Sequence, residues 1–147
     1  MTNVLKALAG ILTGDATLAA DLGVRATASG TIPALYDGQA PEELPPEGYP
    51  YLIVEGRIAT PGASHATERL IYVVDIYDGP AAYSAARTYR IADRIDRLLD
   101  GECPAIEGHT SLGIDRESRH RVIEEEPGYQ HVHLEYLVRY GREDLYR

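Results

Sequence analysis

The sequence lacks the features of a secreted or membrane-spanning protein. Only one of its 147 residues, Cys103, is a cysteine, so no disulfide can form within the chain. A lone cysteine makes a reducing cytosol the simplest compartment. The start of the chain lacks the basic region and apolar block of a signal peptide, and no stretch approaches the ~18 consecutive apolar residues that cross a bilayer. We therefore expect a single soluble domain, made in the cytoplasm, that does not bind membranes.

The sequence also lacks the patterns of familiar catalytic and cofactor sites. It contains no glycine-rich dinucleotide fingerprint and no phosphate-binding loop with its lysine. Ser64 and His65 are adjacent, but no pattern sets a carboxylate beside them. Residues 108–113 read Gly-x-x-Ser-x-Gly, which is not the spacing of a nucleophile elbow. Cys103 follows the end of a predicted helix, whose negative dipole opposes thiolate formation. We expect no enzyme activity and no cofactor.

Charge and aromatic content restrict the partners. The net charge is −9 at pH 7, and Lys6 is the only lysine. Such a chain is not attracted non-specifically to nucleic acid or to anionic membranes. Tryptophan and phenylalanine are absent, whereas tyrosine occurs 11 times. The polar tip of tyrosine suits an assembly surface or, equally well, the wet edge of a core.

One strand is predicted to lead into one long helix. Residues 70–78 are almost all β-branched, aromatic or apolar, which is typical of a largely buried strand. Pro80 suits the first turn of a helix, with one of the two preceding residues as its cap. The helix is expected over residues 80–100, and Gly101 stands where a left-handed C-cap residue belongs.

The rest of the chain predicts an α+β fold in which a mainly antiparallel sheet packs against the long helix and a short N-terminal helix. Residues 129–140 alternate between apolar and polar, as in a strand with one buried face. The chain is predicted to be a single domain, 1–147, with a helical segment at 1–23, a Pro/Gly-rich loop at 27–50, a sheet plus helix over 51–140 and a polar tail at 141–147. Within 51–140, further strands are predicted at 51–56 and 119–125, and a hairpin centred on Pro61 at 57–67.

One pattern in the last predicted strand offers metal-binding chemistry. His131, His133 and Glu135 alternate along the strand, so their side chains share a face. Two imidazoles and a carboxylate are zinc-type ligands, and His120 on the neighbouring strand is the one plausible supplement. The alternative is a polar face that is solvated or turned toward a partner, and we favour it.

The long helix carries a row of four arginines, Arg87, Arg90, Arg94 and Arg97, which we call the arginine row. Asp93 lies four residues before the last of them, a favourable spacing for an ion pair. The opposite face is expected to be apolar through Ala85, Tyr89, Ala92, Ile95 and Leu99. The row is either a solvated face or a surface for the carboxylates of a partner.

The order of these pieces resembles the tail-terminator, or tail-completion, proteins of long-tailed bacteriophages and related phage-like particles such as gene transfer agents. The resemblance extends roughly from residue 5 to 140 and concerns shape rather than catalytic signatures. It depends on Asp15, Leu18 and Leu22 of the N-terminal helix, on the sequences at 35–41 and 49–56, on Val-Asp-Ile-Tyr at 74–77 before the helix that carries Ile-Ala-Asp-Arg-Ile at 91–95, and on the final alternating strand.

The resemblance implies a structural virion protein that forms a hexameric ring. Such a ring caps the tail tube, stops polymerisation of the tube protein and presents a surface to the head connector or stopper, while double-stranded DNA passes through the lumen without specific binding. The family has no catalytic residues. Another neck protein, or a small metal-dependent enzyme that uses His131, His133 and Glu135, remains an alternative. The interface candidates are Tyr36, Asp37, Tyr49, Pro61, His65 and the arginine row.

Overall fold

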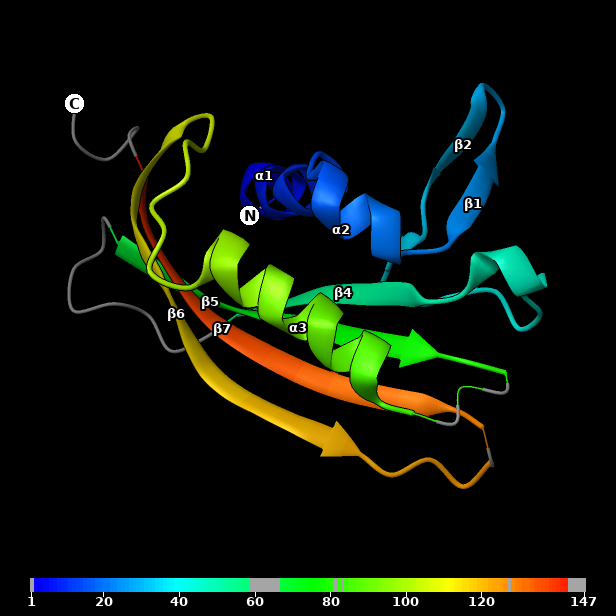
Figure 1. Cartoon of the computed structure of the whole chain (residues 1–147). Helices are drawn as coiled ribbons and strands as arrows, with labels where there is room; N and C mark the ends of the chain where they lie inside the picture. The colour runs from blue at the N-terminus through cyan, green and yellow to red at the C-terminus, as the bar shows by residue number, and fades with distance from the viewer. Residues whose placement is uncertain (1, 59–66, 81, 83, 127, 143–147) are drawn as a thin grey trace.

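A five-stranded sheet carries its helices on one face (Figure 1), as seen in a computed structural model that describes residues 2–58, 67–80, 82, 84–126 and 128–142. Its strands are β3 (Leu35–Asp37), β4 (Tyr51–Ile58), β5 (Thr67–Asp78), β6 (His109–Val122) and β7 (Gln130–Arg142). The spatial order is β3-β4-β5-β7-β6. β3 and β4 are parallel, and the other neighbours are antiparallel. The fold is α+β, as the sequence predicts.

Helices cover the inner face of this sheet. They are α1 (Thr2–Thr13), α2 (Ala16–Asp21) and α3 (Ala86–Leu99), and Pro46–Gly48 forms a short 3-10 turn, η1. α1 packs on β4, whereas α3 lies over β5, β7 and β6. β1 (Val24–Thr27) and β2 (Gly30–Pro33) pair as a separate hairpin that projects away from the sheet (Figure 1). No helix among the described residues is long and apolar enough to cross a membrane.

The predicted alternation of β7 is confirmed and builds the centre of the core. The inward side chains Val132, Leu134, Tyr136, Val138 and Tyr140 are each at most 2% exposed. They meet the buried face of α3, which consists of Thr88, Ile91, Ala92, Ile95 and Leu99. The predicted apolar face of this helix was therefore partly wrong, because Tyr89 is 38% exposed and Ile91 is fully buried.

α1 approaches the sheet most closely at a glycine. A Cβ atom on Gly56 of β4 would lie 2.5 Å from Leu5 Cδ2. Real Cβ atoms do not come so near another carbon, so a side chain at residue 56 would force the Leu5 side chain, and with it the packing of α1 on β4, to shift. This contact shapes one wall of the pocket described below.

The predicted start of the long helix was wrong. α3 begins at Ala86, six residues after Pro80. Ala82, before the helix, is hydrogen-bonded to the turn that precedes β7 and to the first residue of β7. Its N–H donates to Gly128 O (2.7 Å), and the Ala82 carbonyl accepts from Gln130 Nε2 (2.9 Å). The cap residue Ala85 has no side chain that can accept a hydrogen bond, and the Ser84 hydroxyl accepts from the Ala86 N–H (3.1 Å). Gly101 does adopt the predicted left-handed conformation, with φ of 78°.

Two further boundaries differ from the prediction. β6 begins at His109, ten residues before the predicted strand at 119–125, and ends at Val122. Register shifts at Ser111/Gly113 and Arg116/Ser118 interrupt its alternation, so the period-two pattern is lost over its first half. The predicted loop at 27–50 contains β2 and β3, and only the part after β3 lacks strands. The tip of the predicted hairpin, with Pro61, lies outside the described residues.

Candidate functional site

Three members of the arginine row are engaged within the chain. Arg94 donates through Nε and Nη2 to both oxygens of Asp15, at 2.9 and 2.7 Å. Arg90 forms the same two-bonded pair with Asp21 of α2, at 3.0 and 2.7 Å. Arg87 pairs in this way with the buried Asp78 at the end of β5, at 2.8 and 2.7 Å. Paired arginines of this geometry position elements, so most of the row joins α3 to α2 and β5.

Asp15 performs two structural tasks at once. Its carboxylate accepts the backbone N–H of Leu18 at 2.8 Å and so caps α2, while it also holds Arg94. The hydrogen bond from Arg94, followed by that from the Leu18 N–H, lowers the pKa of Asp15 to about 2. The aspartate that the tail-terminator resemblance includes is therefore a junction between two helices.

The other flank of α3 is fixed to the sheet by aspartates. Asp96 accepts from Arg116 Nη1 (2.8 Å), from Arg119 Nη1 (3.0 Å) and from the hydroxyl of Tyr136. Arg119 also bonds Asp93 at 2.8 Å. Asp93 thus pairs with β6 rather than with Arg97, the partner that helical spacing predicts. Arg97 has no hydrogen bond or ion pair among the residues that the structure describes.

The histidines of β7 lie with three carboxylates on the outer face of the sheet. Asp75 Oδ1 stands 2.6 Å from His131 Nε2 and 2.7 Å from His133 Nδ1. The remaining ring nitrogens face Glu124 (2.8 Å) and Glu135 (3.0 Å). We call these five residues the histidine cluster. The His120 ring lies 4.9 Å from that of His133, centroid to centroid.

This arrangement differs from the metal-site alternative that the sequence left open. Each ring nitrogen of His131 and His133 already faces a carboxylate oxygen, so the nitrogens are directed at hydrogen-bond partners. No group of three or more His, Cys, Asp or Glu residues within the described ranges is arranged to hold a metal ion. Burial alone would lower the pKa of His133, but its hydrogen bonds with Glu135 and Asp75 outweigh burial and raise it. The cluster is a charged hydrogen-bond network.

Tyrosines continue this outer face toward β3. The Tyr77 ring stacks on His131 with centroids 4.1 Å apart and on Tyr51 at 5.1 Å. Burial raises the pKa values of Tyr51 and Tyr77 to about 12. Two interface candidates join this row, since Tyr36 and Tyr49 both meet Tyr51 edge to face, at 5.9 and 5.5 Å. An open groove of about 370 Å³ lies beside them, lined by Tyr51, Tyr77, Tyr129 and Glu124 to Glu126.

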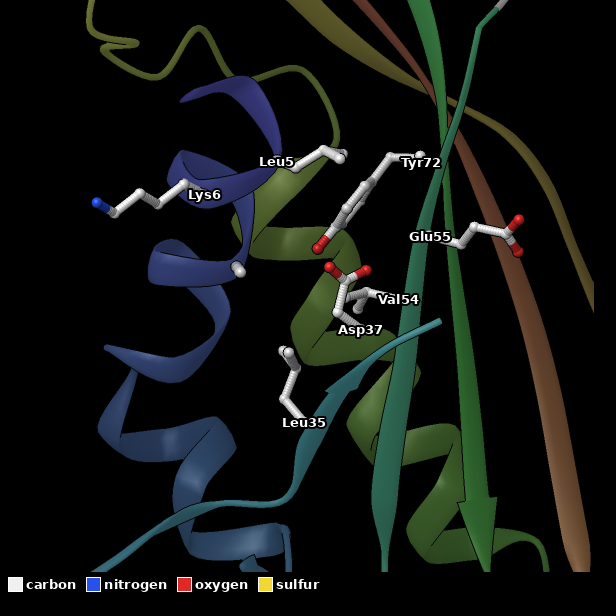
Figure 2. A pocket seen from close by; sticks show the side chains of 9 residues that line it. Leu5, Lys6, Leu35, Asp37, Val54, Glu55 and Tyr72 are labelled. Atoms are coloured by element: carbon white, nitrogen blue, oxygen red, sulfur yellow. The ribbon is translucent and has the colours of Figure 1, made fainter. Parts of the chain in front are cut away.

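The third candidate of this region, Asp37, lies in a different place, a pocket of about 350 Å³ between α1 and the β3–β4 edge (Figure 2). We call it the edge pocket. Its apolar wall includes Leu5, Ala9, Leu35 and Val54. Figure 2 shows the carboxylate of Asp37 and the hydroxyl of Tyr72 pointing toward each other. The exposed Lys6 also lines the pocket, but its ammonium points away from it.

Tyr72 is the one residue of the edge pocket whose chemistry is unusual. Its side chain is 1% exposed, and its hydroxyl has no hydrogen-bond partner among the described residues. Burial, and secondarily the charge of Asp37, raises its pKa. Sequence reasoning counted Tyr72 as strand core, because the hydrophobic pattern alone does not reveal whether a buried hydroxyl is paired.

The remaining predicted residues are placed as follows. Cys103 is exposed in the loop after α3. Ser111 belongs to β6, and its hydroxyl is buried without a partner among the described residues. Ser64 and His65, like Pro61, lie outside the described residues. The candidates therefore divide between the tyrosine row, the edge pocket and α3.

Comparison with known proteins identifies the fold. No protein-family model matches the sequence, and no curated protein matches it. Among solved structures, a chain in the virion of a native gene transfer agent particle matches with a TM-score of 0.71 and 20% identity, over 92% of each chain. A second solved chain matches with a TM-score of 0.57 and 14% identity, over 93% of this chain and 94% of that one. The chain thus shares its whole fold with a chain of a gene transfer agent virion.

Proposed function

We propose that this protein is a structural component of a tailed, phage-like particle and that it closes the tail tube as a ring. One observation carries the proposal: nearly the whole chain has the fold of a chain in a gene transfer agent virion, with a TM-score of 0.71 over 92% of both. The sequence resemblance to tail-terminator proteins supports the same assignment independently. The protein is assigned no catalytic residue and no cofactor.

The proposed ring is a hexamer built by head-to-tail contacts. A contact between two different surfaces of identical subunits gives a closed ring when the rotation closes. The ring ends the tail tube, stops addition of tube protein and offers its other side to the head connector or stopper. A net charge of −9 would let double-stranded DNA pass through the lumen without adhering.

The interface candidates differ in whether their side chains are free to contact another protein. Asp37 is exposed and Tyr49 is half-buried beside the β3–β4 edge, so both can contact another protein, whereas Tyr36 is only 8% exposed and offers little surface. Arg87, Arg90 and Arg94 are occupied by aspartates of the same chain, so their substitution would disturb the fold first. Of the arginine row, Arg97 is the member to test as a contact.

Deletion of the gene tests the function in the particle. Loss of a tail terminator leaves tail tubes of uncontrolled length that do not join heads, because polymerisation is no longer stopped. Loss of a connector or stopper, the alternative neck role, leaves tails of normal length that stay unjoined. Electron microscopy with length measurement separates the two results. Particles with normal, joined tails would contradict both roles.

Purified components test the capping step. We expect native mass spectrometry to show a hexamer, alone or after tube protein is added. Prepolymerised tubes exposed to the protein should stop elongating when tube monomer is supplied, and the ring should be visible at one end. Protein heated past unfolding and re-cooled without regaining its circular dichroism spectrum serves as the negative control. Elongation at an unchanged rate, with no ring on the tubes, would contradict capping.

A further inference from the structure

The edge pocket has the chemistry of a receptor for a long cationic side chain. Two oxygen acceptors, the Asp37 carboxylate and the Tyr72 hydroxyl, converge in it (Figure 2). The Tyr72 hydroxyl has no hydrogen-bond partner among the described residues, and the exposed Asp37 carboxylate has no ion-pair partner among them. Leu5, Leu35 and Val54 supply the apolar wall that the aliphatic stem of an arginine or lysine prefers. An arginine provides five N–H donors, enough for both acceptors at once.

The unpaired hydroxyl is the stronger of these observations. A buried hydroxyl group normally has a partner, and leaving it without one costs free energy. Tyr72 is 1% exposed, yet its hydroxyl faces the pocket without a bond to any described residue. Lys6, the nearby cation, points out of the pocket and does not neutralise Asp37. A donor from outside the subunit would therefore meet the exposed Asp37 carboxylate first, and would reach the covered Tyr72 hydroxyl once the Asp37 side chain turns toward that donor.

The sheet itself places a suitable donor at its opposite edge. The paired residues Asp37, Val54, Val74, Leu134 and Arg119 form one row across all five strands. The adjacent row on the same face starts at Leu35 and ends at Arg121, ~6.5–7 Å along the strands. Asp37 and Arg121 thus lie on the same face of the sheet, on its two opposite edge strands, and at nearly the same height along the strand direction.

Arg121 also differs from its neighbours on β6. Arg116 and Arg119 both bond the aspartates of α3. Arg121 is exposed and has no hydrogen bond or ion pair within the described part of the chain. An arginine at one edge and an anionic pocket at the other are complementary in charge. A surface pair of this kind joins identical subunits head to tail, because each copy donates once and accepts once.

We propose that Arg121 of one copy enters the edge pocket of the next copy, where its guanidinium bonds the Asp37 carboxylate and the Tyr72 hydroxyl. The inference rests on the proposed ring and names the contact that closes it. It makes the β6 edge and the β3–β4 edge the two surfaces of the subunit interface.

Charge reversal tests the pair. Arg121→Glu and Asp37→Arg should each raise the dissociation constant of self-association about 30-fold or more, as loss of a desolvated charge pair does. The double variant Asp37→Arg/Arg121→Glu should regain most of the affinity, since it restores one opposite pair. Arg69→Glu, an exposed arginine on the outer face of β5, is the matched control and should assemble normally. Sedimentation velocity over a concentration series measures all five proteins, including the unmodified chain.

Each outcome decides a different question. If the unmodified chain forms no ring, alone or on tail tubes, the proposed function fails. If it forms a ring that Arg121→Glu leaves intact, or if the double variant is no better than the singles, this inference fails while the ring stands. If Asp37→Arg assembles normally but no longer joins tubes, the pocket holds another protein, and the inference is overturned. Tyr72→Phe adds a readout without charge change: assembly should weaken about tenfold while the fold is retained.

Discussion

Tyr72→Phe should stabilise the isolated subunit, and Tyr136→Phe should destabilise it. The two tyrosines are direct cross-strand partners on β5 and β7, and both side chains are at most 1% exposed. They differ in their hydroxyl groups. That of Tyr136 donates to Asp96, whereas that of Tyr72 has no partner among the described residues. The same substitution at two neighbouring positions therefore removes a satisfied group in one case and an unsatisfied group in the other.

The expected magnitudes follow from hydrogen-bond energetics. A hydrogen bond to a charged group contributes about 1.5–3 kcal/mol, so Tyr136→Phe should lower the free energy of unfolding by about 2 kcal/mol. An unsatisfied buried polar group costs about 1–3 kcal/mol, and Tyr72→Phe should recover about 1 kcal/mol of this. For a chain of this length 1 kcal/mol corresponds to roughly 3 °C in Tm. The two variants should differ by about 9 °C.

Urea denaturation followed by far-ultraviolet circular dichroism measures both changes. The experiment must be run at several protein concentrations, because the proposed self-association would add to the apparent stability. The slope m should stay constant across the variants, which shows that the folded and unfolded states are otherwise unchanged. A loss of more than about 1 kcal/mol in Tyr72→Phe would refute the reasoning, because it would mean that this hydroxyl has a stabilising partner.

Three further changes probe other contacts. Gly56→Ala should lower the free energy of unfolding by about 1–3 kcal/mol, because its Cβ would lie 2.5 Å from a leucine methyl of α1. The control Gly10→Ala should be neutral or stabilising, because a Cβ there would have no atom within 4 Å. Equal effects of the two substitutions on stability would contradict the close approach of α1 to β4. The pKa of Asp15 is lowered to about 2, so its contribution to stability is present above pH 3.8 and lost toward pH 2. In a Tm-versus-pH curve, Asp15→Asn should therefore reduce the fall in Tm between pH 3.8 and pH 2. An unchanged fall would exclude the Asp15–Arg94 ion pair as its cause. The pKa of His133 is raised, so its contribution is present below pH 6.5 and lost as pH rises through the folded value. Tm should fall over this pH range in the unmodified chain but not in His133→Gln. If the Tm-versus-pH curves of the two proteins run parallel, the bonds of His133 to Asp75 and Glu135 do not stabilise the fold.

Periodicity predicted the elements whose pattern is regular. β7 alternates without interruption, and its five inward residues are all buried, so its position and its faces were predicted together. β6, with 14 residues, is about as long as β7, with 13, but it contains two register shifts. Each shift moves the side chains that follow it to the other face of the sheet. A pattern that reverses twice in fourteen residues gives no clear period, which is why the predicted strand began only at residue 119.

The candidate site could be predicted only in part because its chemistry depends on distant partners. The arginine row was recognised on one helix, but the aspartates that occupy it come from α2 and β5, up to 79 residues away. The histidine cluster was noticed through two histidines and a glutamate, whereas Asp75, which joins them, belongs to another strand. Helical or strand spacing describes neighbours on one element and carries no information about which carboxylate a fold brings opposite.

The position of Lys6 turns the edge pocket into a place that can be observed directly. It is the only lysine of the chain, it is exposed, and it lines the pocket while its ammonium points toward solvent. Apart from the α-amino group of the chain, an amine-reactive fluorophore therefore has one amine to modify, the Lys6 side chain, which lines the pocket. The dye would be shielded from an aqueous quencher when the pocket is covered and exposed to it when the pocket is open. The composition thus supplies an optical reporter beside the β3–β4 edge without any engineered residue.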